Sequence, residues 1–146
     1  DEIIYIHIDD QHPDTIRFVD ECEKWFNQPI NRIQSKHKSV ENACLSSGGR
    51  GYINGVGGAA CTKFLKRRLR KEWELSQNED LIYIWGMDIN EKNRCDRIKN
   101  GKQDQKHKFS LTENNISKED AHKILTDNNI KHPVMYEIGY YNNNCV

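Results

Sequence analysis

Two adjacent carboxylates follow an apolar run near the start of the chain, in the segment His7-Ile8-Asp9-Asp10-Gln11-His12. Carboxylates at the carboxyl end of a strand can accept hydrogen bonds from ribose hydroxyls or base amines, or hold a divalent cation. A His/Asp/Asp/His metal cluster is one interpretation, but strand alternation splits these ligands across two faces. We therefore expect no metal. Asp9 and Asp10 are candidate nucleotide contacts, with helix capping by Asp10 as the alternative.

A glycine-rich segment leads into a strongly basic one. Six of the nine glycines lie within residues 48–58, and six lysines and arginines follow within residues 63–71. Backbone amides at a helix N-terminus, reinforced by lysine and arginine, can bind phosphate or sulfate. The spacing matches neither a P-loop nor a dinucleotide-binding fingerprint. The alternative is a loop followed by a solvated charged helix face.

A third segment, residues 85–94, places Gly86 directly after an apolar strand. Glycine at that position lets a ligand approach the backbone closely. Glu91 and Arg94 lie three residues apart on the following turn. They can face one pocket or pair with each other, and taken alone the pairing is favoured.

The elements that must position these residues alternate along the chain. Near-continuous apolar runs predict buried strands over 3–8 and 81–85, and a shorter strand is expected over 30–34. Helical spacing predicts helices over 13–27, 61–75 and 91–99, and Ser117 with Asp120 predicts a capping box that opens a helix to about 128. Residues 100–108 are expected to form a polar connection.

The pattern predicts an α/β fold, a parallel sheet with helices on both faces, incomplete at both ends. Ligands of such sheets collect at the carboxyl ends of the strands, which again indicates Asp9, Asp10, Gly86 and Asp88.

Length and composition narrow the class of protein. The 146 residues suit a single domain over 1–146, and a chain that opens within a strand is expected to be a fragment of a longer one. The mean hydropathy is −0.91 and no stretch approaches the roughly 18–20 apolar residues of a membrane span, which excludes a transmembrane protein. The net charge of zero argues against nucleic acid as a partner, so a nucleic-acid role for the basic helix is only the third hypothesis. Five scattered cysteines, without a C-x-x-C pair, indicate reduced thiols and a cytoplasmic location.

In this order, the three segments resemble the phosphoadenosine phosphosulfate reductase family, within the adenine nucleotide alpha-hydrolase-like superfamily. They look closest to bacterial and phage members known by family only. The likeness is carried by the strand end and helix start at 8–15, the Cys-Thr and Leu-Lys pairs within 54–66, the Gly, Glu, Arg block at 86–94, and the Pro-hydrophobic-Tyr and Gly-Tyr stretch at 132–140 with Cys145.

The resemblance implies an adenine nucleotide as the ligand, with chemistry at its α-phosphate or on an attached sulfate. In the intact protein the substrate would be an adenylyl sulfate or ATP, and the reaction sulfur transfer or reduction. The candidate nucleotide-binding residues are Asp9 and Asp10 on the adenosine side, Gly57, Gly58, Cys61, Thr62, Lys63, Lys66 and Arg67 around the anionic tail, and Gly86, Asp88, Glu91 and Arg94 around the pocket. Cys145 is the candidate catalytic thiol, and no iron-sulfur cluster is expected because the cysteines are not paired.

The chain also departs from the family's pattern. The family's Ser-Gly-Gly-Lys-Asp-Ser-type pyrophosphate loop would precede residue 1, so an enzyme is expected only if the full protein supplies it. Asp88 stands where the family commonly has arginine, which inverts a charge. The alternative function is a catalytically inactive binding protein of the same fold, such as a phage-encoded partner or inhibitor of a host complex. Its protein partner would contact the tyrosine- and asparagine-rich tail over 136–144.

Overall fold

The computed structural model describes residues 2–46, 51–56, 58–77, 80–101 and 105–143. Its contacts divide the chain into two compact units. Unit 1 comprises Asp1–Gln77 with His132–Val146, and unit 2 comprises Asn78–Lys131. The single domain over 1–146 stays a prediction.

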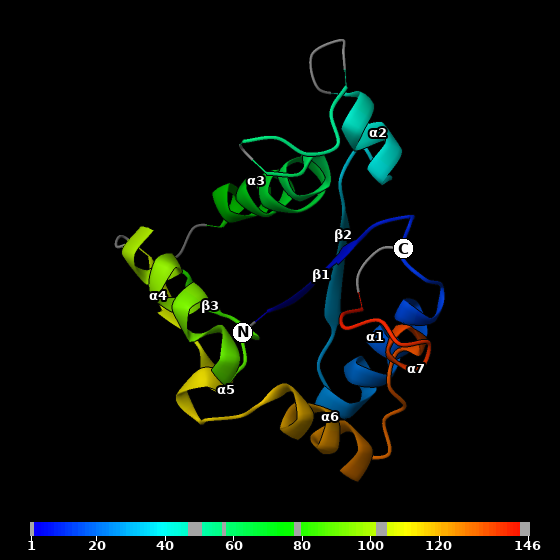
Figure 1. The fold of residues 1–146 in the computed structure, drawn as a ribbon, viewed down its shortest axis with the longest axis vertical. Helices are drawn as coiled ribbons and strands as arrows, with labels where there is room; N and C mark the ends of the chain where they lie inside the picture. The colour runs from blue at the N-terminus through cyan, green and yellow to red at the C-terminus, as the bar shows by residue number, and fades with distance from the viewer. Residues whose placement is uncertain (1, 47–50, 57, 78–79, 102–104, 144–146) are drawn as a thin grey trace. The chain divides into compact units, whose positions relative to one another are not determined.

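Unit 1 is built on two parallel strands joined by a helix (Figure 1). Its elements are β1 (Ile3–His7), α1 (Asp14–Phe26), β2 (Ile30–Gln34), α2 (Val40–Leu45), η1 (Thr62–Arg67), α3 (Arg68–Ser76) and α7 (Val134–Glu137). The register of the strand pair runs from Ile3 opposite Ile30 to His7 opposite Gln34. The two strands and the α1 crossover confirm the predicted elements for residues 3–34, but β1 is partly buried along its whole length instead of buried on both faces.

Two buried clusters hold unit 1 together. In the first, Val19 and Cys22 of α1 pack against Ile30 of β2. In the second, Ile8 after β1 packs against Ala43 of α2 and Leu65 of η1, and all three are at most 1% exposed. Full burial of a large aliphatic side chain contributes about 1.5–3 kcal/mol. The second cluster therefore fixes which face of the basic helix turns inward.

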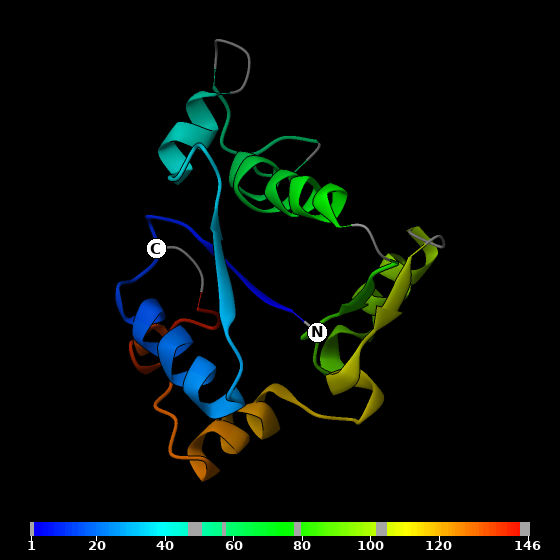
Figure 2. The same cartoon turned by 180° about the vertical axis from the view of Figure 1, so that it is seen from behind.

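Unit 2 contains the second parallel pair, shown from behind in Figure 2. Its elements are β3 (Ile82–Ile84), η2 (Ile89–Glu91), α4 (Lys92–Gly101), β4 (Lys106–Lys108), α5 (Ser110–Glu113) and α6 (Lys118–Asp127). Its core gathers Met87, Cys95 and Phe109, with Trp85 and Ile98 packed against them. The predicted capping box is confirmed, since Ser117 and Asp120 satisfy each other's backbone N–H groups at the start of α6.

Two predictions for unit 2 are wrong. The strand at 81–85 is not buried on both faces, because Ile82 and Ile84 are 54% and 69% exposed. Within the described residues β3 pairs with β4, and it alternates between exposed and half-buried residues because one of its faces is covered. The polar connection expected over 100–108 contains β4, which pairs through its backbone although its side chains are basic.

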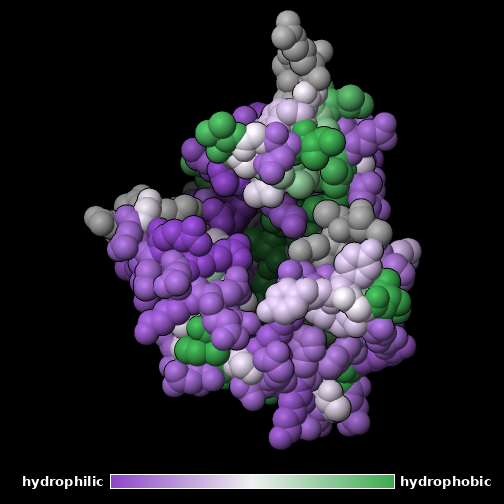
Figure 3. Space-filling view, in the orientation of Figure 1, coloured by the Kyte–Doolittle hydropathy of each residue, from purple (hydrophilic) through white to green (hydrophobic). Residues whose placement is uncertain are grey.

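The mixed α/β class with parallel strands is confirmed in both units. One sheet covered by helices on both faces stays a prediction. The short helices α2, α5 and α7 were not predicted, since four to six residues are too few for a clear helical period. None of the helices in the described part of the chain is long and apolar enough to span a membrane. Hydrophilic side chains predominate on the face drawn in Figure 3.

Candidate functional site: a basic groove with two aromatic rings

Residues 51–56, the described part of the glycine-rich segment, are held against α2 and the start of the basic helix by backbone hydrogen bonds. The N–H of Tyr52 donates to the carbonyl of Cys44 at 3.1 Å, and the N–H of Ala60 donates to that of Ile53 at 3.0 Å. Gly51 has φ +62°, and a Cβ atom there would lie 3.2 Å from the Cys44 carbonyl oxygen. The loop can approach α2 this closely because residue 51 is glycine, and Tyr52 is placed accordingly.

The basic helix begins with a π-helical turn, η1, which continues into α3. Such turns are rare and occur frequently at functional sites. The side chain of Leu65 anchors η1 in the core, at 1% exposure. Because residues four apart lie on the same face, Lys63, Arg67 and Lys71 form one row on the outer side of the helix.

A groove of about 460 Å³ runs along this outer face. It is lined by four basic and two aromatic side chains: Tyr52, Lys63, Phe64, Arg67, Arg68 and Lys71. All six belong to unit 1. The aliphatic stems of lysine and arginine and the two rings provide an apolar wall, with the charged groups at its rim.

One of the four cations is neutralised within the helix. Arg68 Nε lies 3.0 Å from Glu72 Oε1, four residues later. Among the described residues, Lys63, Arg67 and Lys71 form no ion pair, and the Lys63 Nζ atom lies 5.1 Å from the centroid of the Phe64 ring. The groove therefore carries a local positive charge in a chain whose net charge is zero.

Phe64 is held in place from the turn that follows β2. The hydroxyl of Ser35, a residue that is 6% exposed, donates to the Phe64 carbonyl at 3.1 Å. The His37 ring meets the Phe64 ring edge-on, with centroids 5.4 Å apart. These contacts position one wall of the groove before any ligand binds.

The carboxylates after β1 have structural partners within unit 1. The N–H of Val40 donates to Asp10 Oδ2 at 2.6 Å, so Asp10 assists the N-cap residue Ser39 at the first turn of α2 and does not cap the helix that follows it directly. Gln34 Nε2 donates to Asp9 Oδ1 at 2.6 Å, and His7 Nε2 lies 3.6 Å from the same atom. In the described residues, no group of three or more His, Cys, Asp or Glu side chains could hold a metal ion. The nucleotide contact of Asp9 and Asp10 stays a prediction.

The candidates at 86–94 lie in unit 2. Asp88, at 8% exposure, accepts a hydrogen bond from the N–H of Asn90 at 2.8 Å and caps η2. Arg94 pairs with Glu91 at 2.8 Å, as favoured from their spacing. A Cβ atom on Gly86 would meet nothing within 4 Å, so the space beside the backbone there is open.

Of the remaining candidate residues, some lie near the groove and others are outside the part of the chain that the structure describes. Gly57 and Cys145 lie outside the described residues. Gly58 has φ +93°, a conformation suited to glycine, while Cys61 packs against the cluster around Leu65. Thr62 and Lys66 lie beside the groove without lining it.

Lys63 and Arg67 are the predicted residues that the structure brings together in the groove. Sequence reasoning did not assign Tyr52, Phe64, Arg68 or Lys71 to the site. Lys71 could have been found from the sequence, because it lies four residues after Arg67, as Arg67 lies four residues after Lys63. Tyr52 could not, because nothing in a glycine-rich segment indicates that its ring lines a groove. The chain matches no protein-family model, no curated protein and no solved structure.

Proposed function

We propose that this chain binds an adenine nucleotide and places its phosphate or sulfate groups in the basic groove. The proposal follows the resemblance to the phosphoadenosine phosphosulfate reductase family, with an adenine nucleotide alpha-hydrolase-like fold and a cytoplasmic location. The observation that supports it is the row of Lys63, Arg67 and Lys71, three cations without an ion pair among the described residues, beside two aromatic rings.

The groove suits both halves of such a ligand. Arginine binds phosphate or sulfate through paired N–H donors, and lysine adds a compact positive charge. An aromatic ring offers a face on which a purine can stack. In the intact protein the ligand would be an adenylyl sulfate or ATP, acted on at sulfur or at the α-phosphorus. We expect the 146 residues alone to bind weakly and to turn over little.

Calorimetry with ATP, adenylyl sulfate and its 3′-phosphorylated form tests the proposal. Lys63→Ala with Arg67→Ala should weaken binding at least tenfold, because each charge-assisted hydrogen bond contributes about 1.5–3 kcal/mol. Lys24→Ala with Arg97→Ala removes the same charge from α1 and α4 and should leave binding unchanged. An absence of heat with all three ligands, for the chain and for a longer protein that contains it, would refute the proposal.

The second candidate is the catalytically inactive binding protein. It is favoured by apolar exposure near the end of unit 1, where Ile138, Tyr140 and Tyr141 are 59%, 50% and 72% exposed. Tyrosine is enriched at protein interfaces. This candidate predicts that none of the three nucleotides binds.

A further inference from the structure

The cations of the groove are arranged as a row. Lys63 and Lys71 are eight residues apart, which at the α-helical rise corresponds to at most about 12 Å along the axis, because part of the span is the π-helical η1. Arg67 lies between them on the same face, and all three line the groove. A single phosphate or sulfate group can contact one or two of these side chains. A ligand that uses the whole row must carry several phosphates in succession.

The aromatic walls indicate what lies between the phosphates. Phe64 and Tyr52 both line the groove, and both are partly buried. Lys63 already lies over the Phe64 ring, so Tyr52 is the better platform for a base. A positively charged groove with aromatic rings along it is how proteins bind single strands of nucleic acid, with the backbone on the cations and the bases on the rings.

We propose that the groove binds a short single-stranded nucleic acid, with its phosphates along Lys63, Arg67 and Lys71 and a base stacked on Tyr52. This inference rests on the proposed function, because it uses the same groove and extends the ligand from one nucleotide to a strand. The net charge of zero is no obstacle, since the salt dependence of binding counts the phosphates contacted locally.

The groove's lining also predicts which features of the strand are read. Among the described residues, its walls hold no Asn, Gln, Asp or Glu to pair with base edges, and its arginines and lysines, which can pair with guanine, face the phosphates in this arrangement. Stacking accepts every base, because every base has an aromatic face. We therefore expect little sequence preference and weak binding of duplexes, whose bases are already stacked on one another.

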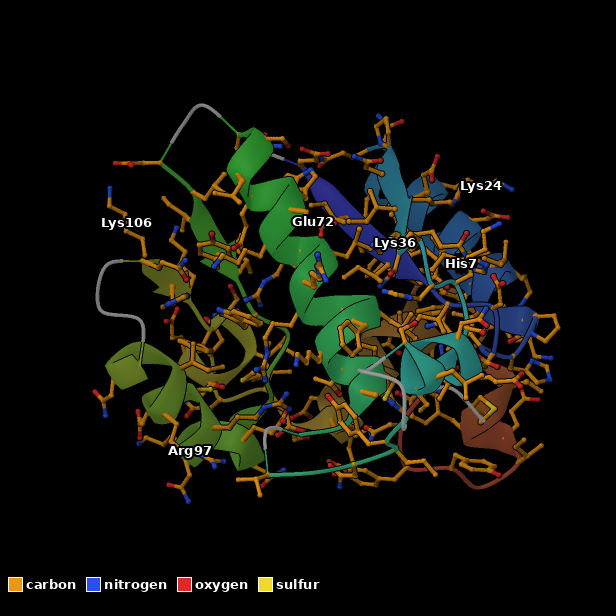
Figure 4. All side chains as sticks on the ribbon, turned by 90° about the horizontal axis from the view of Figure 1, so that it is seen from above. His7, Lys24, Lys36, Glu72, Arg97 and Lys106 are labelled. Carbon is orange, nitrogen blue, oxygen red and sulfur yellow. The ribbon has the colours of Figure 1, made fainter. Side chains whose placement is uncertain are left out.

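Glu72 limits the charge of the groove. Its carboxylate neutralises Arg68, the fourth cation of the lining, and Figure 4 shows it on the α3 helix. Glu72→Gln should release Arg68 for phosphate and tighten strand binding several-fold. Glu119→Gln, on the exposed side of α6 in unit 2, makes the same change in net charge and should have no effect.

The test uses the full 146-residue chain and the fluorescence anisotropy of an end-labelled eight-nucleotide single strand between 50 and 200 mM salt. Neutralising three phosphates predicts that the logarithm of the association constant falls with a slope of about −2 against the logarithm of salt concentration. Lys63→Ala with Arg67→Ala and Lys71→Ala should abolish most of this slope. The matched triple variant Lys24→Ala, Arg97→Ala and Lys106→Ala, whose residues are labelled in Figure 4, should keep it.

A further variant separates stacking from charge. Tyr52→Leu should weaken strand binding about tenfold and leave the salt slope unchanged. Urea denaturation of each variant shows that it is folded. If a duplex binds as tightly as the single strand, or if Tyr52→Leu has no effect on affinity, the proposal of a single-strand site is wrong.

The proposal and the proposed function can fail separately. If ATP binds as tightly as the strand, the groove is a mononucleotide site, so the inference fails and the proposed function stands. If the strand binds and ATP does not, the inference holds and the proposed binding of a mononucleotide is wrong. If neither binds, both are wrong.

Discussion

The side chain of Asp14, in the first turn of α1, accepts a hydrogen bond at 2.8 Å from the backbone N–H of Val134, which lies 120 residues later in the chain. The same carboxylate holds Arg17 at 2.6 and 2.9 Å, and Arg17 donates to the carbonyl of His132 at 3.0 Å. The hydrogen bonds that Arg17 donates to the Asp14 carboxylate raise the pKa of Arg17. This pair ties the C-terminal part of unit 1 to its first helix.

Asp14→Ala should therefore destabilise unit 1. The variant leaves the half-buried Val134 N–H without its acceptor and removes one of the two carboxylates that pair with Arg17, the other being Glu21, which we expect to cost about 2 kcal/mol in the free energy of unfolding. Urea denaturation measures the change. Asp20→Ala, on the same helix, breaks a more exposed pair with Arg32 and should cost about 0.5 kcal/mol. Equal costs would show that the contact with Val134 contributes nothing.

The role of Asp10 can be separated from nucleotide binding. Because Asp10 accepts the Val40 N–H at the start of α2, Asp10→Ala should lower the free energy of unfolding by about 1 kcal/mol without any ligand present. Asp10→Asn retains an oxygen acceptor and should keep most of the stability. If both variants keep full stability but lose ATP binding, Asp10 is a nucleotide contact and not a cap.

Cys22 makes the stability of unit 1 sensitive to alkali. Burial, and next the charge of Glu21, raise the pKa of the Cys22 thiol above its ordinary value of 9.0. The thiol ionises more readily in the unfolded chain. The free energy of unfolding should hold its value below about pH 9 and fall as the pH rises through the pKa of the folded thiol.

Cys22→Ala should remove this alkaline loss. At neutral pH the variant should cost about 1 kcal/mol, because its smaller side chain packs less well against Val19 and Ile30. Urea denaturation between pH 7 and pH 10 compares the two chains. Parallel profiles would contradict the assignment to Cys22.

The capping box of α6 predicts an effect at acid pH. Hydrogen bonds from the backbone and side chain of Ser117 lower the pKa of Asp120 below its ordinary value of 3.8. The ionised Asp120 carboxylate stabilises α6 through these hydrogen bonds at pH values above its ordinary pKa. This stabilisation is lost as the pH falls through the lowered pKa of the folded state. In Ser117→Ala, NMR should show Asp120 titrating at higher pH. Thr126→Ala, at the other end of the helix, should leave that titration unchanged.

The predicted fold agrees best with the structure where the signals are local. Strand 30–34 matches β2 residue for residue, and α1 lies within the helix expected over 13–27. Both signals are contained in the segment itself: apolar residues recur at helical spacing, and Pro13 and Pro29 mark where the helix begins and ends. β4 was missed because Lys106, His107 and Lys108 form a strand only through pairing with β3, and that pairing leaves no mark on the residues.

The candidate site divides in the same way. Lys63 and Arg67 could be predicted, because a glycine-rich segment followed by clustered positive charge indicates an anion site. Asp10 could not be assigned, since its partner Val40 lies 30 residues away. Whether Asp10 lines a pocket or bonds to a distant helix depends on where the chain runs after β2, because that path brings Val40 next to Asp10.

The sequence by itself determined the α/β alternation, the crossover helix between two parallel strands, the capping box and the positive charge of residues 63–71, because each depends on residues that are neighbours along the chain. Only the tertiary structure decided that Leu65 turns inward, that Lys63, Arg67 and Lys71 consequently face out as a row, and that Tyr52 closes the groove beside them. The physical reason is burial: the contact of Leu65 with Ile8 and Ala43 sets the rotation of the helix, and these partners lie 57 and 22 residues away in the sequence.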